Sequence, residues 1–151
     1  MRIVAQRVGY CKVIIDSETY SEISNGLLCY IGASKNDTEE DMKWTIEKAI
    51  NLRIFEDENG KLNLSLKDVE GELMLVSQFT LYGSVKKGKR PSFTEAASIE
   101  DGRRLYSSAV EYAKSIFDED KVKTGSYQAM MNVEYSNLGP VTIIIDSEKN
   151  F

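Results

Sequence analysis

The chain has 151 residues, 42% of them hydrophobic and 28% charged, and its net charge at pH 7 is −5. This length and composition are typical of one globular domain, so we expect residues 1–151 to form a single domain. The negative charge argues against a general DNA-binding protein, because such proteins neutralise backbone phosphates with basic residues.

No apolar run approaches the roughly 20 residues of a membrane helix, and the opening MRIVAQRV lacks the parts of a secretory signal. Cys11 and Cys29 lie in strand-like runs, where buried and reduced thiols are expected. We therefore expect a cytoplasmic protein without a membrane partner.

The sequence contains no histidine. This excludes Ser-His-Asp and Cys-His catalysis and removes the commonest zinc ligand. There is also no CxxC pair and no glycine-rich phosphate loop of standard spacing. We expect no metal and no cofactor, so catalysis has to use hydroxyls, amides, backbone dipoles, carboxylates or a group of the substrate.

Three strands are predicted near the amino terminus, because Val, Ile, Leu and Tyr recur there between polar turn residues. They span Arg2–Arg7, Cys11–Asp16 and Gly26–Gly32. Arg7 stands in an otherwise apolar strand, where a charge is costly unless it is paired. A structural ion pair is one explanation, and a functional contact is the other.

A helix is predicted to begin at Asp37, with Glu40 three residues later as a carboxylate capping box, and to end near Asn51. The apolar face of this helix comprises Met42, Ile46, Ala49 and Ile50. The segment EDENGK at 56–61 then carries an Asn-Gly hairpin signal. It lacks the alternating oxygen ligands of a calcium loop, so we interpret it as a turn.

A second helix is predicted to begin near Ser98. Its apolar residues at helical spacing are Leu105, Ala109, Tyr112 and Ile116. The other strands are predicted at Glu72–Phe79, Met130–Tyr135 and Val141–Asp146, and the Asn-x-Gly-Pro between the last two is locally typical of a hairpin connection. This order predicts an α+β fold, a mainly antiparallel, barrel-like sheet covered by two helices.

The strand Glu72–Phe79 leads into a polar cluster of Ser77, Gln78 and Thr80. These side chains either satisfy backbone groups at the strand end or present functional groups from a rigid scaffold. The sequence SQFTLY at 77–82, followed by KKGKRPSF at 86–93, strongly resembles the D-aminoacyl-tRNA deacylase family and its SQxxL motif. The stretches at 51–65 and 6–8 resemble the same family.

A second motif, NLGPVT at 137–142, resembles the family's NxGPVT, in which Gly-Pro forms a cis peptide and enters the active site of the dimer partner. The resemblance implies a homodimer in which Gly139 and Pro140 act as a chirality gate. In the functional alternative to a structural ion pair, Arg7 anchors the partner's Gly-Pro loop across the dimer interface. Many members have Asp where this chain has Leu138, a departure that changes the polarity of the loop.

A third stretch, TGSYQAMMNV at 124–133, resembles the family's TGxFGAxMxV. Tyr127 and Gln128 depart from the Phe and Gly of that pattern, so the pocket wall is expected to differ in detail. By resemblance Met131 lines the adenine side of the pocket, although filling the core explains a methionine equally well.

The resemblance implies an enzyme that hydrolyses the ester of aminoacyl-tRNA, with the 3′ end and acceptor stem of the RNA as its partner. Backbone amides around Gln78 and Phe79 are expected to stabilise the oxyanion, at about 2.7–4 kcal/mol for each donor. The hydroxyls of Ser77 and Thr80 have no visible base, which favours a substrate-assisted route through the ribose 2′-hydroxyl. Glycine has no side chain that could clash with the gate, so Gly-tRNA is a predicted side substrate.

Two features leave alternatives open. One feature is the set of basic residues Lys86, Lys87, Lys89 and Arg90. They form either a solvated loop or a contact for acceptor-stem phosphates. A related deacylase that edits L-alanine tends to have Ala-Thr after the Gln and a TNGPYT-like second motif, which Phe79 and SNLGPVT argue against. A non-catalytic RNA- or protein-binding module and a structural dimerisation domain are further alternatives.

Overall fold

The computed structural model describes residues 1–150. Its central strand is β1 (Arg2–Ile15), which pairs antiparallel with β2 (Glu18–Ile23), β3 (Gly26–Gly32) and β8 (Asn132–Asp146). The two strands predicted in the first sixteen residues are therefore one strand, whose pairing with β8 is irregular between Gln6 and Cys11. The sequence did not predict β2, because ETYSEI is too polar to show an apolar pattern.

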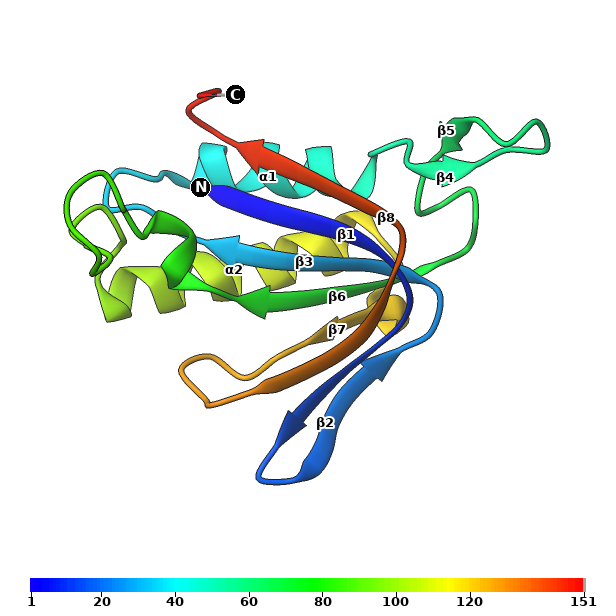
Figure 1. Cartoon of the computed structure of the whole chain (residues 1–151). Helices are drawn as coiled ribbons and strands as arrows, with labels where there is room; N and C mark the ends of the chain where they lie inside the picture. The colour runs from blue at the N-terminus through cyan, green and yellow to red at the C-terminus, as the bar shows by residue number, and fades with distance from the viewer. Residues whose placement is uncertain (151) are drawn as a thin grey trace.

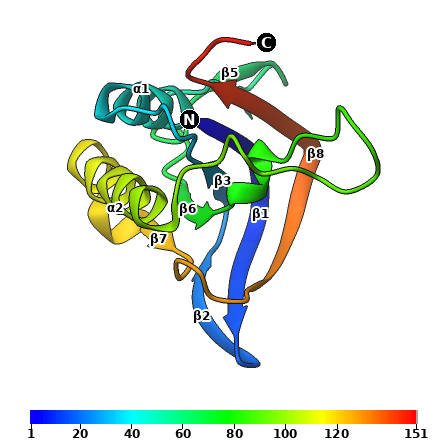
Figure 2. The same cartoon turned by 90° about the vertical axis from the view of Figure 1, so that its left-hand side faces the viewer.

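Two parallel pairs extend this sheet. β6 (Glu72–Ser77) runs parallel to β3, and β7 (Val122–Thr124) runs parallel to β6. The helices α1 (Glu39–Ile50) and α2 (Ile99–Ile116) lie in the two crossovers and cover one side of the curved sheet (Figures 1 and 2). The predicted α+β class is confirmed, with one correction: these two strand pairs are parallel. Each helix returns the chain to the end of the sheet at which the preceding strand began, so the next strand runs in the same direction.

Both helices begin at side-chain caps. In α1 the cap is Thr38 rather than the predicted Asp37, and Thr38 forms a capping box with Asp41. The helix ends at Asn51 as predicted, and α2 begins after Ser98, whose hydroxyl accepts from the amide of Asp101 at 3.1 Å. The start of α1 differs by one residue because both Asp37 and Thr38 can cap, and tertiary contacts occupy Asp37.

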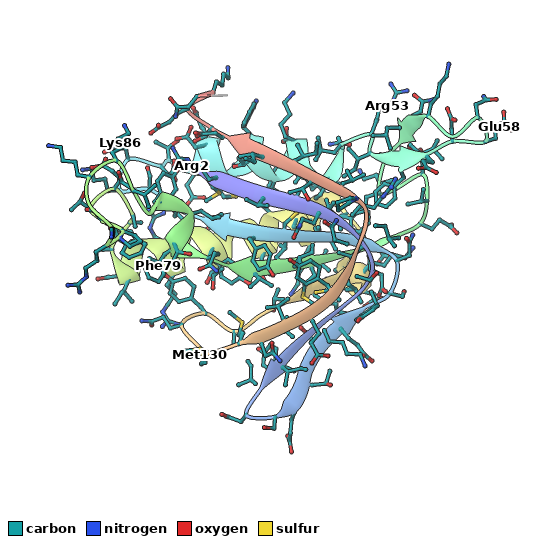
Figure 3. The ribbon with its side chains drawn as sticks, in the orientation of Figure 1. Arg2, Arg53, Glu58, Phe79, Lys86 and Met130 are labelled. Carbon is teal, nitrogen blue, oxygen red and sulfur yellow. The ribbon has the colours of Figure 1, made fainter. Side chains whose placement is uncertain are left out.

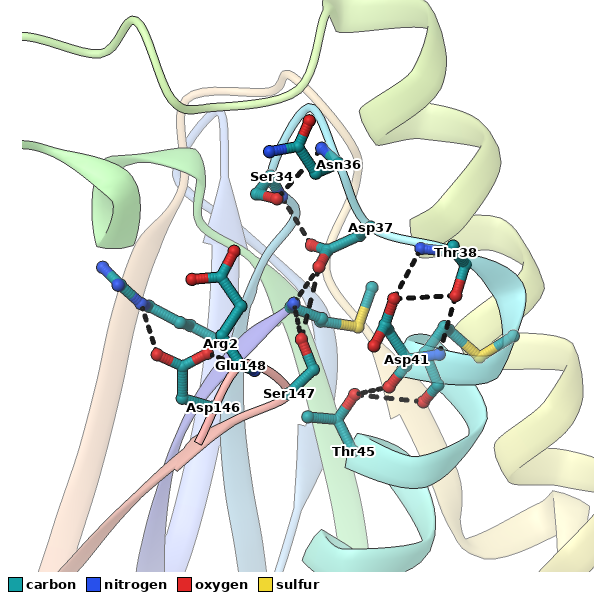
Figure 4. A network of polar contacts seen from close by, with 12 residues as sticks. Arg2, Ser34, Asn36, Asp37, Thr38, Asp41, Thr45, Asp146, Ser147 and Glu148 are labelled. Carbon is teal, nitrogen blue, oxygen red and sulfur yellow. Dashed lines mark hydrogen bonds and ion pairs between the residues drawn. The ribbon is translucent and has the colours of Figure 1, made fainter. Parts of the chain in front are cut away.

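The contacts of Asp37 belong to a polar network at the amino terminus (Figure 4). Its carboxylate pairs with the Met1 amine and accepts from the amide of Ser34. Beside it, Arg2 pairs with Asp146 at 3.2 Å. Burial by itself raises the pKa of Asp146, but hydrogen bonds from Asn150, Glu148 and Arg2 outweigh it, so the pKa is lowered. This network fixes β1 and β8 beside the start of α1.

The sheet has an apolar cluster on each face. One cluster joins Ile3 and Ala5, in the first half of β1, to both helices. The other packs Leu28 and Val76 against β2 and the first half of β8. Cys11 and Cys29 are buried and unpaired, as predicted, and burial raises the pKa of the Cys11 thiol to about 12. Both thiols are therefore packing residues.

The strand β8 corrects the prediction of two strands joined by a hairpin. It runs from Asn132 to Asp146, and both of its halves pair with β1, so the Gly-Pro motif lies inside a strand. The turn predicted at 56–61 is confirmed by a small hairpin of β4 (Phe55–Glu56) and β5 (Leu62–Leu64). Within residues 1–150, no helix has the length and apolar character to cross a membrane.

Candidate functional site

The polar cluster lies where β6 ends beside α2. Ser77 is the last residue of β6, and its neighbour across the sheet is Ile31. The chain leaves the strand at Gln78 and enters the 3-10 helix η1 (Phe79–Tyr82). The predicted strand therefore ends two residues early, because the turn begins as soon as pairing with β3 ends. The cluster is presented at the carboxyl end of β6, a strand paired on both sides, where a rigid scaffold supports an exposed turn.

Two hollows meet at Gln78. A small cavity of about 30 Å³ contains Ser77, Gln78 and Phe79 on the side of α2. A groove of about 430 Å³ is lined by Gln78 and Thr80 on one side. Its other walls come from β1, β3 and the segment that leads into β8, and they include Val4, Tyr30 and Met131. The structure therefore separates the two hydroxyls: Ser77 belongs to the cavity and Thr80 to the groove. Met131 lines the same groove as Thr80.

The backbone amides of the turn are not equivalent. The Gln78 amide donates to the carbonyl of Ile31 at 2.7 Å, so it is already used by the sheet. The amides of Phe79 and Thr80 begin the turn, where a helix has no internal acceptor, and the hydrogen bonds among residues 1–150 include none for them. Of the two amides predicted to stabilise the oxyanion, the Phe79 amide is free of a protein acceptor and the Gln78 amide is not. The Thr80 amide is a second free donor.

The groove carries hydroxyls and amides but no carboxylate, lysine or arginine among its lining residues in the part of the chain described. Tyr30 is its only ionisable lining residue, and burial, together with Tyr135, raises the pKa of its phenol. Tyr30 therefore stays neutral near pH 7 and is no base. The site is built for positioning and dipole stabilisation rather than for proton abstraction by a side chain.

The Gly139-Pro140 pair lies in the middle of β8, between Asn137 and Thr142, where pairing with β1 is interrupted. The peptide bond between the two residues is cis, and Gly139 has φ +114°, a conformation that residues with a Cβ rarely adopt. The Asn137 amide group donates to the carbonyls of Arg7 and Val141 at 3.1 and 3.0 Å. This side chain holds both ends of the interruption, which leaves Gly139 and Pro140 exposed.

Arg7 is 8% exposed and lies behind this segment. Its guanidinium donates to the carbonyl of Ile54 at 3.0 Å and to that of Leu138 at 3.4 Å. It also forms an ion pair with Glu56 at 3.8 Å. Within one chain Arg7 therefore links the β4–β5 hairpin to the Gly139 segment, and the structural ion pair is present.

One chain does not bring the two motifs together. Gly139 and Pro140 lie level with Arg7 on β1, whose partner on β3 is Leu27, whereas Ser77 lies level with Ile31. Strand geometry then separates the motifs by about 20 Å along the sheet, from four residues of rise and three strand spacings. The Gly-Pro segment of a chain therefore lies away from the turn of the same chain.

The four basic residues Lys86, Lys87, Lys89 and Arg90 lie in an exposed loop after η1. This loop is at the same end of the molecule as Phe79 and Met130, whereas Arg53 and Glu58 mark the opposite end (Figure 3). Two backbone hydrogen bonds between Ser84 and Ser92 close the base of the loop. The basic residues therefore adjoin the polar cluster in space as well as in sequence.

The sequence did not single out the α2 side of the small cavity. Gly102 lies in the first turns of α2, and a Cβ at this position would lie 2.5 Å from the Tyr127 hydroxyl. That hydroxyl donates to the carbonyl of Ile99 at 3.1 Å. A glycine on a buried helix face is the signal that marks this contact, since glycine is unfavourable inside helices.

Comparison with known proteins identifies this arrangement. The model of the D-Tyr-tRNA(Tyr) deacylase family matches residues 4–146. The chain belongs to the D-Tyr-tRNA(Tyr) deacylase family. The resemblance seen in the two motifs is thereby confirmed, and the chain is an enzyme of the deacylase class, a hydrolase.

Relatives of this deacylase family match over the full chain. The D-aminoacyl-tRNA deacylase of Thermotoga petrophila is 52% identical, and that of Clostridium novyi is 50% identical, each with 100% of both chains covered. A solved structure described as "c-Myc DNA Unwinding Element Binding Protein" has a TM-score of 0.93 at 37% identity, covering 97% of this chain and 98% of that one. A structure described as a "probable eukaryotic D-amino acid tRNA deacylase" has a TM-score of 0.80 at 17% identity, with 95% and 97% covered, and shows the same fold.

Proposed function

We propose that this protein hydrolyses the ester that joins a D-amino acid to the 3′-terminal ribose of tRNA, in the cytoplasm, as a proofreading step of translation. The observation that carries the proposal is the pair of free amides of Phe79 and Thr80 beside a groove without an ionisable base. An ester carbonyl placed there would gain two donors as its oxygen becomes negative. Membership of the deacylase family supports the same reaction.

The water needs activation that the groove does not supply. In the proposed route the ribose 2′-hydroxyl orients a water against the ester carbonyl, while the amides of Phe79 and Thr80 hold the oxyanion. The water oxygen bonds to the carbonyl carbon, the bond from that carbon to the 3′ oxygen then breaks, the 3′ oxygen takes a proton of the water, and free amino acid and tRNA leave. Ser77 and Gln78 position the terminal nucleoside from the cavity side.

Alanine substitution of the hydroxyls tests this route. Ser77→Ala and Thr80→Ala are expected to retain measurable hydrolysis, because neither hydroxyl is the nucleophile. Thr19→Ala, at an exposed threonine in β2, is the control. A substrate with a 2′-deoxy terminal ribose is expected to be cleaved much more slowly. Near-complete loss in either alanine variant, with substrate binding intact, would exclude the substrate-assisted route.

Chirality selection is proposed to come from Gly139 and Pro140 of a second copy. Since these residues lie about 20 Å along the sheet from Ser77 of their own chain, the gate requires a homodimer. Their carbonyls would occupy the space that an L side chain needs. Arg7 would hold the gate, either in its own chain, where it contacts Leu138, or across the dimer interface.

Matched substrates test the gate. D-Tyr-tRNA and Gly-tRNA are expected to be cleaved and L-Tyr-tRNA to be spared, since glycine has no side chain to exclude. Light scattering at assay concentration is expected to show a dimer. A monomer that still discriminates D from L, or equal rates on D- and L-Tyr-tRNA, would remove the cross-subunit gate. Cleavage of L-alanyl-tRNA in preference to D-Tyr-tRNA would favour the related editing activity, and no cleavage of any substrate would favour a binding module.

The basic loop is proposed to contact acceptor-stem phosphates. Replacement of the four basic residues of the loop by Gln is expected to raise KM and to weaken the salt dependence of kcat/KM. A control with the same change of charge neutralises four exposed lysines elsewhere, at Lys43, Lys48, Lys61 and Lys67. Equal effects of the two sets would assign the loop to general electrostatics.

A further inference from the structure

Two phenylalanine rings lie exposed beside the free amides. Phe79 begins η1 and is 57% exposed, and Phe93, after the basic loop, is 38% exposed. Their ring centroids are 5.1 Å apart with an interplanar angle of 64°, an edge-to-face arrangement. Large exposed aromatic groups are informative because burial is their usual state. This pair, Phe79 and Phe93, is called the aromatic ledge below.

The aromatic ledge is fixed in place without being covered. A Cβ at Gly83 would lie 2.9 Å from Cε1 of Phe93, so the ring packs closely against the backbone after η1. Hydrogen bonds of 2.8 and 2.9 Å between Ser84 and Ser92 close the loop directly before Phe93. A preformed ring surface binds a partner at a lower entropic cost than one that has to be ordered on binding.

The charge around the aromatic ledge is positive although the whole chain is acidic. Residues 83–94 contain four basic residues and no acidic residue. Those four basic residues form no ion pair within the described part of the chain. Unpaired cations beside exposed aromatic rings are the combination that proteins use to bind unpaired nucleotides, with phosphates on the cations and bases stacked on the rings. A duplex hides the faces of its bases, so the ledge fits a single strand.

We propose that the aromatic ledge stacks a nucleobase of the unpaired RNA 3′ end, upstream of the terminal nucleoside that carries the ester. This inference rests on the proposed function. Phe79 directly follows Gln78, and Gln78 lines both the cavity and the groove. An ester held at the amides of the turn therefore places the terminal nucleoside beside Gln78. Phe93 lies on the side of the basic loop, where the next nucleotide leaves the site. The ledge thereby fixes the direction in which the RNA approaches.

Substitution of Phe93 separates stacking from chemistry, because Phe93 contributes no group to the oxyanion site. The measured quantity is the ratio of kcat/KM on D-Tyr-tRNA to kcat/KM on the D-tyrosyl ester of adenosine, which has no upstream nucleotide. Phe93→Ala is expected to lower this ratio about tenfold through KM, and Phe93→Trp is expected to restore it. The control is Val85→Ala, an exposed apolar residue of the same loop, which is expected to leave the ratio unchanged.

Binding provides a second measurement that does not depend on catalysis. Fluorescence anisotropy with a four-nucleotide unpaired RNA ending in adenosine is expected to show about tenfold weaker binding to Phe93→Ala than to the wild type. Thermal unfolding of each variant monitors the fold. An unchanged activity ratio together with unchanged oligonucleotide binding would overturn the ledge, as would an equal loss on the tRNA and on the nucleoside ester. If the wild type cleaves neither ester, the proposed function fails, while the oligonucleotide result still decides whether the ledge binds RNA.

Discussion

The conformation of Gly139 offers a quantitative test of the gate. Gly139→Ala adds a methyl group at φ +114°, where it would lie 2.8 Å from the amide nitrogen of Val141 and 3.1 Å from Nη2 of Arg7. A backbone in this sparsely populated region costs an alanine about 1–3 kcal/mol. The contact with backbone requires a shift that costs about 1–3 kcal/mol more. The sum is about 2–6 kcal/mol of folding stability.

A loss of this size is measurable by calorimetry and by urea unfolding. For a chain of this length it corresponds to a fall in Tm of about 4–24 °C. The matched control is Gly60→Ala, where φ is +72° but nothing lies within 4 Å of the added Cβ. That variant carries the conformational cost alone, about 1 kcal/mol. The difference between the two variants therefore measures the contacts of the added methyl group at Gly139 together with the higher backbone cost at φ +114°.

The proposed gate predicts that the same substitution reduces chirality discrimination, because the shifted segment would no longer fill the space of an L side chain. The ratio of kcat/KM on D-Tyr-tRNA to that on L-Tyr-tRNA is expected to fall at least tenfold, since small displacements at a reaction site have large effects on rate. A Tm close to that of Gly60→Ala, together with an unchanged D-to-L ratio, would refute the reasoning.

Three further outcomes are expected. The pKa of Asp146 is lowered in the fold, so its carboxylate stabilises the protein above the ordinary pKa near 3.8, and this stabilisation is lost as pH falls through the folded pKa. Asp146→Asn is therefore expected to flatten the fall of Tm below pH 4. An unchanged slope of Tm against pH would contradict this. Arg7→Met leaves two backbone carbonyls without their donor and is expected to lower the free energy of unfolding, measured in urea, by about 2–4 kcal/mol. A loss below about 1 kcal/mol would contradict this prediction. Gly102→Ala is expected to destabilise the wild type through the Tyr127 hydroxyl at 2.5 Å, but to stabilise the Tyr127→Phe background by about 1 kcal/mol through helix propensity. The same sign of effect in both backgrounds would exclude the contact.

The elements that the sequence predicted well are those with local signals. Ser98 caps α2 and Asn51 ends α1 because each contacts backbone within four residues of itself. The Asn-Gly turn at 56–61 is equally local. The capping of α1 was displaced by one residue, from Asp37 to Thr38, because the Met1 amine and the Ser34 amide compete for the Asp37 carboxylate.

The misread strands share one cause. Nothing in the residues between Arg7 and Cys11, or around Gly139, shows that both flanking segments pair with the same neighbour. The polar β2 and the three-residue β7 have too little apolar pattern to be recognised, and they exist as strands because their neighbours supply the hydrogen bonds. Strand pairing depends on which chain segment lies alongside, and sequence proximity does not determine this.

The sequence by itself determined the family through SQFTLY and NLGPVT, the class of fold, and the lack of any histidine for catalysis. The tertiary structure alone decided that the Gln78 amide is occupied by Ile31, which leaves Phe79 and Thr80 as the free donors. It also decided that Gly139 lies far along the sheet from Ser77 of the same chain. Motifs are local and readable from residue types, whereas the use of a hydrogen-bonding group depends on partners that only folding brings near.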